Sequence, residues 1–422
     1  MAIGISLLLA GSFLFSLAGG RVPPDVTVQG VEVGGLRYSV AETLVREQIK
    51  SELLPLTIRT PKKDYVFRSE FSFTDDVPAL LRGAKSGDKL QAHVKRVWAD
   101  AESALEKICE ENAEEGENAT VSFSVEGFTY TAERPATCCN YSALLRDVCS
   151  ALESGGTEVP LSTFTRAPAI TLKTLRGRTK LLSTFTTRFD GNNAVRAGNI
   201  ALACSRITGT TLDAGEEFSF NKTVGKRTKE NGFGEAIVIF DGEFVPGVGG
   251  GVCQASTTLF NAALRAGLTI TESRSHSLSI SYVSPSLDAM VSEYSDLRFI
   301  NPYEFPVYIG ARTGKNTVTF DVFGAPDGYR YETESVVLKR VSPPEPKRIE
   351  GAENACIRAE KEGLTSESYL LVYDSEGNLI SRKKLRRDSY AALQGIYQVA
   401  PEPPPEEENP EEQPPETNEE GN

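Results

Sequence analysis

The chain has 422 residues, of which 40% are hydrophobic, and its 58 acidic residues outnumber 45 Lys and Arg to give a formal net charge of −13. This length predicts two or three domains, and the hydrophobic fraction is sufficient for packed cores. The acidic balance argues against a nucleic-acid-binding protein, because binding to the phosphate backbone needs basic surfaces.

The first segment, residues 1–20, is apolar and carries no charged side chain. Its length is close to the ~20 apolar residues that span a bilayer as a helix. It is either a signal peptide cut after Ser16-Leu17-Ala18 or a retained anchor, which we favour because the apolar run is longer than a typical h-region. We therefore expect one N-terminal anchor in the cell membrane with extracytoplasmic domains, or a secreted protein if the segment is cleaved.

Residues 21–167 predict one α+β domain, in which short strands alternate with longer helices. Apolar residues at spacings of three and four predict helices over residues 39–53, 92–113 and 140–156. Ser39 is the predicted N-cap of the first helix, and residues 119–132 alternate in the manner of a strand. The first of the two histidines, His93, falls on the second helix, where we interpret it as exposed or half-packed.

Four of the seven cysteines gather in this domain: Cys109, Cys138, Cys139 and Cys149. Because extracytoplasmic cysteines are usually paired, we expect one or two disulfides here, with the connectivity left open. No C-x-x-C pair or histidine accompanies them, so a zinc site is not predicted. Cys204 lies among small apolar residues at helical spacing and is predicted to be a buried core thiol. Cys356 lies in a charged stretch and receives no role.

Residues 168–325 predict a β-rich domain with two helices. The first helix is predicted over residues 193–209 and is closed by Gly209, and the second begins at Cys253. Further patterns predict a hairpin turn at residues 241–242, a strand over 268–283 and a turn over 313–316.

The remaining chain predicts two more segments. Residues 326–400 read as a small accessory β module with a hairpin turn at 375–378. Residues 401–422 consist mainly of Pro and Glu without Lys or Arg, which predicts a disordered tail. The fold class predicted for the whole chain is therefore α+β.

Cys253 is the strongest candidate for chemistry, because it follows Gly249–Gly251 and begins a helix. A helix N-terminus favours the thiolate, and His276, 23 positions later (276 − 253), falls on the strand predicted to follow that helix. An imidazole there can exchange protons with the thiol, and glycines permit backbone N–H groups to converge on an oxyanion. Alternatively, the glycines make only a tight turn and the thiol is a packing residue.

The partner of the imidazole remains open between Asp288 and Asp296, and either can instead be a turn or capping residue. We assign substrate or oxyanion binding to Gly250, Gly251, Gln254, Ser256 and Arg274. No metal and no nucleotide fingerprint is found in the sequence, so neither cofactor is predicted.

Three motifs carry a family resemblance: GGGVCQASTTLFNAALRAGL, RSHSLSISYV and DLRFINPYEFPVYI. On these motifs, residues 168–325 resemble the VanW family of bacterial cell-envelope proteins, named for its association with vancomycin-resistance clusters. The motif cysteine corresponds to Cys253, the motif histidine to His276 and the preceding arginine to Arg274. This chain departs from the family at Leu287, where relatives often have an arginine before the aspartate that corresponds to Asp288.

The resemblance implies a cell-envelope protein that acts on peptidoglycan. Some members of the family that this chain resembles have been assigned LD-transpeptidase activity, which makes 3–3 cross-links through a cysteine thioester. The resemblance therefore implies the same activity for this chain. Residues 21–167 resemble a peptidoglycan-binding domain often found before VanW domains, so the implied partners are stem peptides and glycan. Two alternatives stay open: a non-catalytic wall-binding or scaffold protein, and a cysteine hydrolase of wall peptides.

Overall fold

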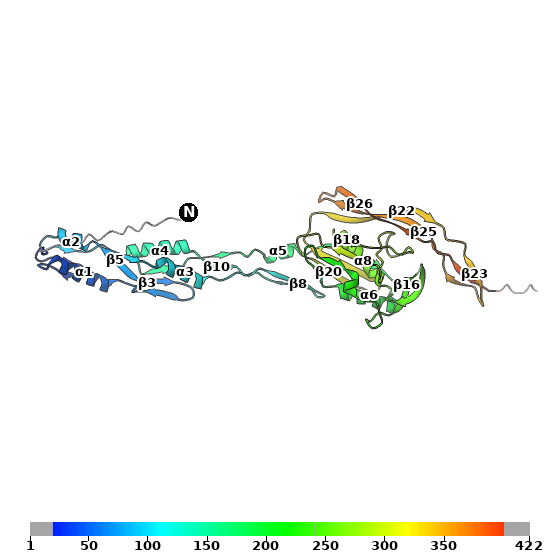
Figure 1. Ribbon diagram of the computed structural model, residues 1–422, viewed down its shortest axis with the longest axis horizontal. Coiled ribbons are helices and arrows are strands. Elements are labelled where there is room, and N and C mark those ends of the chain that lie inside the picture. Colours follow the sequence, from blue (N-terminus) through cyan, green and yellow to red (C-terminus); the bar gives the residue numbers. More distant parts are fainter. Residues whose placement is uncertain (1–19, 241, 401–422) are drawn as a thin grey trace, which may run out of the picture. The chain divides into compact units, whose positions relative to one another are not determined.

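The computed structural model describes residues 20–240 and 242–400, and these fold into mixed α+β units, as the sequence predicts (Figure 1). One compact unit comprises the chain up to Ala119 together with Ala132–Thr171, and a second comprises Thr120–Thr131 and the chain from Leu172. The predicted N-terminal anchor, apart from Gly20, and the predicted Pro/Glu tail lie outside the described residues. Within those residues, no helix combines the length and apolar character needed to cross a membrane.

The first unit combines helices with short strands. Its helices are α1 (Tyr38–Glu52), α2 (Val77–Gly83), α3 (Ala101–Asn112) and α4 (Tyr141–Ser154). Its strands are β1 (Thr27–Val28), β2 (Val31–Glu32), β3 (Leu56–Arg59), β4 (Asp64–Phe67), β5 (Phe71–Asp75), β6 (Lys89–Leu90), β7 (Val94–Trp98), β10 (Ala136–Cys139), β11 (Glu158–Pro160) and β12 (Thr163–Arg166).

The helix predicted over residues 92–113 is wrong in its first half, where β7 pairs with β5 as an antiparallel strand. Trp98 explains the difference, because its ring packs against Phe67 and Phe71 from neighbouring strands, a long-range contact that overrides local periodicity. His93 therefore precedes a strand instead of lying on a helix, and it is exposed.

Helix ends in this unit follow local capping in one case and not in another. The side chain of Asn140 accepts a hydrogen bond from the Ala143 N–H at the start of α4, and Gly155 ends that helix in a left-handed conformation. The predicted cap Ser39 is wrong, because α1 begins at Tyr38. Its N-cap position is therefore Arg37, whose side chain makes no capping hydrogen bond.

A single disulfide among the described residues, Cys109–Cys139, joins α3 to β10. Cys138 and Cys149 are free thiols, so one bridge forms, within the one or two that the sequence predicts. Cys204 in the second unit is buried, as predicted, and burial raises its pKa to about 12.

The second unit contains the candidate site. Its helices are α5 (Leu172–Gly177), α6 (Ala194–Ile207), α7 (Phe220–Val224) and α8 (Val252–Arg265). Its strands are β8 (Thr120–Ser124), β9 (Gly127–Thr131), β13 (Lys180–Arg188), β14 (Thr210–Leu212), β15 (Glu217–Ser219), β16 (Glu235–Phe240), β17 (Glu243–Val248), β18 (Thr269–Glu272), β19 (Arg298–Ile300), β20 (Val307–Thr313), β21 (Thr317–Gly324), β22 (Arg330–Val341), β23 (Lys347–Glu350), β24 (Ala355–Arg358), β25 (Gly363–Tyr373), β26 (Leu379–Tyr390) and β27 (Ile396–Val399).

Helix α8 is the centre of this unit, packing against strands β13 and β21 and against helix α6 (Figure 1). The two strands belong to the sheet β13-β21-β20-β14, whose apolar face joins the largest hydrophobic core of the described chain. All side chains from Val252 to Leu264 are buried except that of Cys253. Helix α8 is therefore buried along this length, and Cys253 is the one side chain in it that is partly accessible.

The strand predicted over residues 268–283 is wrong beyond β18, and residues 273–296 form an irregular segment. Side chains of α8 bind its backbone in place of a neighbouring strand. Asn261 donates to the Leu287 carbonyl over 2.7 Å, and Ser256 donates to the Ala289 carbonyl over 2.5 Å. These bonds satisfy backbone groups that would otherwise need a sheet partner.

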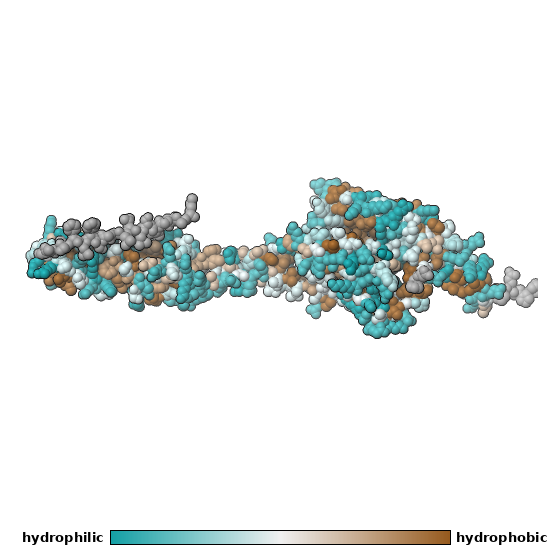
Figure 2. All heavy atoms as spheres, viewed as in Figure 1, coloured by the Kyte–Doolittle hydropathy of each residue, from teal (hydrophilic) through white to brown (hydrophobic). Residues whose placement is uncertain are grey.

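The C-terminal part of the second unit forms the sheets β22-β25-β26 and β23-β27-β24. The predicted turn at residues 375–378 is confirmed, with Asp374 accepting the N–H groups of Glu376 and Asn378. Strand β22 packs against α8. On the face drawn in Figure 2, hydrophilic residues predominate and apolar residues form scattered patches.

Candidate active site

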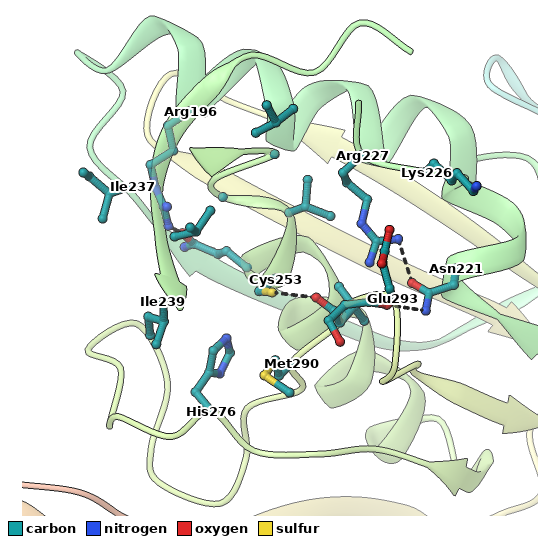
Figure 3. Close-up of a pocket in the computed structure, with 18 of the residues that line it drawn as sticks. Arg196, Asn221, Lys226, Arg227, Ile237, Ile239, Cys253, His276, Met290 and Glu293 are labelled. Atoms are coloured by element: carbon teal, nitrogen blue, oxygen red, sulfur yellow. Dashed lines mark hydrogen bonds between the residues drawn. The ribbon is translucent and has the colours of Figure 1, made fainter. Parts of the chain in front are cut away.

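A cavity of about 790 Å³ lies at the first turn of α8. One wall is the β16–β17 hairpin, which contributes the apolar side chains of Ile237, Ile239 and Phe244. Other walls come from the loop after α7, from α6 and from the irregular segment that carries His276. Cys253 faces this cavity from the N-terminal end of α8 (Figure 3).

The glycine run is required by the backbone. Gly249 and Gly251 have φ values of +85° and +105°, which side chains with a Cβ rarely adopt. Gly250 lies against β16, where a Cβ would be only 2.6 Å from the carbonyl carbon of Ala236. Gly250 is buried and does not line the cavity, whereas Gly249 and Gly251 do. The glycines thus bring the start of α8 close to the hairpin.

The Cys253 thiol is half-buried and lies 3.4 Å from the Val291 carbonyl, to which it donates. Its backbone belongs to the first turn of α8, where the Val252 and Gln254 N–H groups donate to the carbonyls of Gly249 and Gly251 over 3.1 and 2.9 Å. The helix dipole at this end favours negative charge at the sulfur.

His276 and Asp288 form a buried pair beside this thiol. One carboxylate oxygen, Oδ2 of Asp288, lies 2.6 Å from Nδ1 of the His276 ring and also accepts the His276 backbone N–H over 2.7 Å. Only 5% of His276 and none of Asp288 is exposed. Because Nδ1 is bound to the carboxylate, Nε2 is the ring nitrogen left to interact with Cys253 (Figure 3).

Cys253, His276 and Asp288 together are called the relay below, and their charges stabilise one another. Burial alone raises the pKa of the Cys253 thiol, but bonding to His276 and attraction to Arg227 outweigh it and hold the pKa below its ordinary value. Burial lowers the pKa of His276, whereas Asp288 and Cys253 raise it, to about 9. Between these two pKa values the geometry favours a thiolate–imidazolium pair.

The second carboxylate oxygen of Asp288 is bound from the C-terminal part of the unit. The Tyr390 hydroxyl donates to Oδ1 over 2.6 Å, and a guanidinium nitrogen of Arg386 lies 3.0 Å from the same oxygen. Burial raises the pKa of the Asp288 carboxyl, but His276, Arg386 and Tyr390 hold it below its usual value. Neither β26 residue was predicted, since they lie 98 and 102 positions from Asp288 with no motif around them.

The other predicted site residues lie in different surroundings. The Gln254 amide donates to Thr187 and to the Arg188 carbonyl, so it is not directed at the sulfur. Ser256 is fully buried, and its hydroxyl donates to main-chain carbonyls. Arg274 is exposed and does not line the cavity.

Asp296, the alternative partner for the imidazole, lies at α7 instead. Its two oxygens accept hydrogen bonds from the Ser219 hydroxyl and the Asn221 N–H, at 2.6 and 2.8 Å. The structure therefore brings Cys253, His276 and Asp288 together, and it does not bring Asp296 to them.

Two half-buried arginines in the cavity were missed in the sequence. Arg196 of α6 donates to Oε1 of Gln254 over 2.8 Å, and Arg227 donates to Oδ1 of Asn221 over 2.7 Å. Burial lowers the pKa of Arg227. In Figure 3 they lie on the other side of Cys253 from His276. No ion pair joins either arginine to a carboxylate in the described part of the chain.

Across residues 20–240 and 242–400, no group of three or more His, Cys, Asp or Glu side chains is arranged to hold a metal ion. The relay itself consists of one thiol, one imidazole and one carboxylate, in which the imidazole binds the carboxylate and lies beside the thiol. What it can do chemically is supply a nucleophile and move a proton.

Comparison with known proteins locates the matched region. Residues 195–323 match the family model described as "VanW like protein". The uncharacterized protein YoaR of Bacillus subtilis (strain 168) is 44% identical over 135 residues, covering 32% of this chain and 45% of that protein. The vancomycin B-type resistance protein VanW of Enterococcus faecalis (strain ATCC 700802 / V583) is 32% identical over 78 residues, covering 18% and 28%. The chain spans less than half the length of these curated relatives.

Two solved structures show a local likeness. An IgA1 protease G5 domain is 17% identical, with 17% of this chain and 89% of that chain covered, at a TM-score of 0.13. The HP0197-G5 crystal structure is 13% identical, with 17% and 96% covered, at a TM-score of 0.11. Scores this low do not define the fold.

Proposed function

Because residues 195–323 form a VanW-like domain, as the sequence motifs predict, we propose that this protein is a cell-envelope cysteine acyltransferase acting on wall peptides. Its reaction is LD-transpeptidation, which forms 3–3 cross-links through a thioester on Cys253. The observation that carries this proposal is the buried Asp288–His276 pair beside the partly open thiol.

The first half-reaction follows from the charges of the relay. The Cys253 thiolate attacks the carbonyl carbon between the third residue of a stem peptide and the terminal D-alanine. The backbone N–H of Cys253, in the first turn of α8, is the donor for the oxyanion. As the carbon–nitrogen bond breaks, the His276 imidazolium gives its proton to the leaving amine, and D-alanine departs.

The second half-reaction restores the starting state. A side-chain amine of a neighbouring stem attacks the thioester carbonyl, and neutral His276 accepts the proton of that amine. The carbon–sulfur bond then breaks, so the thiolate is released beside an imidazolium. Asp288 remains charged throughout and keeps the ring oriented.

The cavity also supports a substrate with a free carboxylate. Arg196 and Arg227 bring two guanidinium groups to the cavity wall beyond Cys253. Neither forms an ion pair among the described residues, and Arg227 is attracted by the nearby carboxylates of Asp296 and Glu293. Guanidinium groups bind carboxylates strongly. We assign to Arg227 the carboxylate of the departing residue, while the apolar hairpin β16–β17 contacts the rest of the stem.

The cellular setting is part of the same proposal. The expected N-terminal anchor or signal peptide places the enzyme outside the cytoplasm, and residues 21–167 hold it to peptidoglycan. Its partners are then stem peptides and glycan.

The test is incubation of the purified full chain with muropeptides that carry tetrapeptide stems, followed by mass spectrometry. We expect cross-linked dimers and free D-alanine, with product lost in Cys253→Ala and kept in the exposed-thiol control Cys356→Ala. Tripeptide products without dimers would identify a hydrolase instead. Undiminished wall binding without any product would identify the scaffold alternative and refute catalysis.

A further inference from the structure

We infer that strand β26 belongs to the active site, because its residues Arg386 and Tyr390 position the carboxylate of Asp288. The inference deepens the proposed function and rests on it only for the role of Cys253 as nucleophile. Both residues lie beyond residue 323, where the family match ends, so the matched domain does not contain all the groups that hold its carboxylate.

The two carboxylate oxygens of Asp288 bind different partners. Oδ2 receives both contacts from His276, through the ring and through the backbone N–H. Oδ1 receives the Tyr390 hydroxyl at 2.6 Å and the Arg386 guanidinium at 3.0 Å. A carboxylate bound on both sides cannot rotate about its own axis without breaking hydrogen bonds, so the direction of Oδ2 toward the imidazole is fixed.

Arg386 also binds the backbone that carries Asp288. Its Nε donates to the Ser286 carbonyl over 3.1 Å, and its Nη2 donates to the Asp288 carbonyl. The guanidinium lies 5.5 Å from the ring centre of Phe260 on α8. The planar guanidinium of Arg386 therefore contacts the Asp288 carboxylate, the backbone of its loop and helix α8 at once. A flexible ammonium group could not hold these contacts together.

Tyr390, the last residue of β26, completes the arrangement. Its hydroxyl accepts the Ser286 N–H over 2.7 Å while it donates to Asp288. Ser286 has a φ of +62°, a conformation that a residue with a Cβ adopts at a cost and keeps only where its surroundings hold it. The buried hydroxyl of Tyr390 thus supports a strained turn two residues before the carboxylate.

The charged and titratable groups that face the relay come from every element around it. They are Cys253 of α8, Arg196 of α6, Arg227 of the loop after α7, Tyr282, Asp288 and Glu293 of the irregular segment, and Arg386, Asp388 and Tyr390 of β26. Asp388 itself pairs with the Arg386 guanidinium over 2.8 Å. Among them, Arg386 repels an imidazolium by charge and yet supports it by orienting Asp288. Its positive charge also favours the Cys253 thiolate, as orienting Asp288 does, so only a variant that keeps the charge and loses the fork separates the two effects.

The experiment measures the rate of Cys253 alkylation by iodoacetamide against pH, in the full chain with Cys138, Cys149 and Cys356 replaced by serine. If Arg386 orients Asp288, then Arg386→Met weakens the support of the imidazolium and moves the acid limb of the profile to higher pH by about one unit. If Arg386 acted only as a nearby cation, its removal would move that limb in the same direction, because a cation also favours the thiolate, so the charge-keeping variant Arg386→Lys decides between the two roles.

Two conservative variants sharpen the result. Arg386→Lys keeps the charge but loses the fork, so positioning predicts a profile close to that of Arg386→Met, and a wild-type profile would contradict it. Tyr390→Phe keeps the ring and removes only the hydroxyl, so we expect a shift in the same direction with little loss of folding. An unchanged profile in both variants would overturn the inference.

A matched control is Arg382→Lys on the same strand, whose guanidinium pairs with Glu334 away from the cavity. Its alkylation profile should remain that of the parent chain. The readout needs no wall peptide, so a chain that shows these shifts without cross-linking muropeptides would refute the proposed reaction alone. An active chain without the shifts would refute the role of β26 alone.

Discussion

Cys253 differs from its neighbours along α8 in exposure, since every other side chain from Val252 to Leu264 is buried. A thiol that is reachable, begins a helix and lies beside an imidazole held by a carboxylate is placed for nucleophilic chemistry. Cys204 provides the contrast within the same chain. It is buried among apolar side chains, which raise its pKa to about 12 and leave it inert.

The first prediction concerns this difference in thiol reactivity. At pH 7, Cys253 should be alkylated faster than the exposed Cys149, by up to about tenfold for the first unit by which its pKa lies below an ordinary value, with no further gain once the thiol is fully ionised. Mass spectrometry of tryptic peptides after timed quenching measures both rates in one sample. His276→Asn should remove the advantage, and equal rates in the parent chain would contradict an activated thiol.

The second prediction concerns pH, with the sign set by the two pKa values. His276 stays protonated until pH rises through about 9, so the thiolate is paired with an imidazolium between its own lowered pKa and about 9. Transfer to the leaving amine needs that proton, so turnover should fall as pH rises above about 9. A rate that keeps rising through pH 10 would argue against His276 as the acid.

A third prediction at this scale tests the cavity arginine. Arg227→Gln should lower kcat/KM for a stem peptide with a free terminal carboxylate by about tenfold or more, and it should change little for the same peptide as its C-terminal amide. Lys222→Gln, at an exposed position of α7 that does not line the cavity, serves as the control variant. Equal losses for carboxylate and amide would show that Arg227 does not bind the carboxylate.

At the scale of elements, the glycine run joins α8 to the β16–β17 hairpin. Gly250→Ala would place a Cβ 2.6 to 2.7 Å from backbone atoms of Ala236 and Ile237, which cannot yield as a flexible side chain can. We expect a loss of about 1–3 kcal/mol in the free energy of unfolding, measured by denaturant titration. Gly198→Ala in α6 is the matched control, since no atom lies within 4 Å of its added Cβ.

Elements with local signals were predictable from the sequence. Helix α4 has its cap at Asn140 and its end at Gly155, and α8 has an apolar pattern that continues through its length. Residues 92–98 and 273–296 were mispredicted, because their conformations depend on contacts with distant strands or with α8 side chains. Periodicity carries no information about such partners.

The candidate site shows the same division between local and distant information. The glycines, Cys253 and His276 stand out in the sequence because they form motifs. Leu287 stands where the family resemblance places an arginine, and a guanidinium reaches Asp288 from Arg386 instead. No local pattern distinguishes a partner 98 positions away, so this half of the relay required the structure.

At the scale of the whole molecule, the single described disulfide belongs to the first unit and the relay to the second. Replacing Cys109 and Cys139 by alanine should lower the stability of the first unit by about 2–4 kcal/mol. Cys253 alkylation should stay unchanged in that variant. Thermal unfolding followed with alkylation measures both, and a parallel loss of Cys253 reactivity would show that the units are not independent.

The chain passes between its two units three times, because the β8–β9 hairpin of residues 120–131 belongs to the second unit while the residues on either side belong to the first. Phe128 of this hairpin packs against Tyr308 and Phe323 of the second unit. A protease cut between residues 119 and 120, or between 131 and 132, leaves fragments still linked by Cys109–Cys139. A cut between residues 171 and 172 leaves the hairpin packed non-covalently in the second unit. A single cut therefore does not release the unit that carries Cys253 from the unit that precedes it.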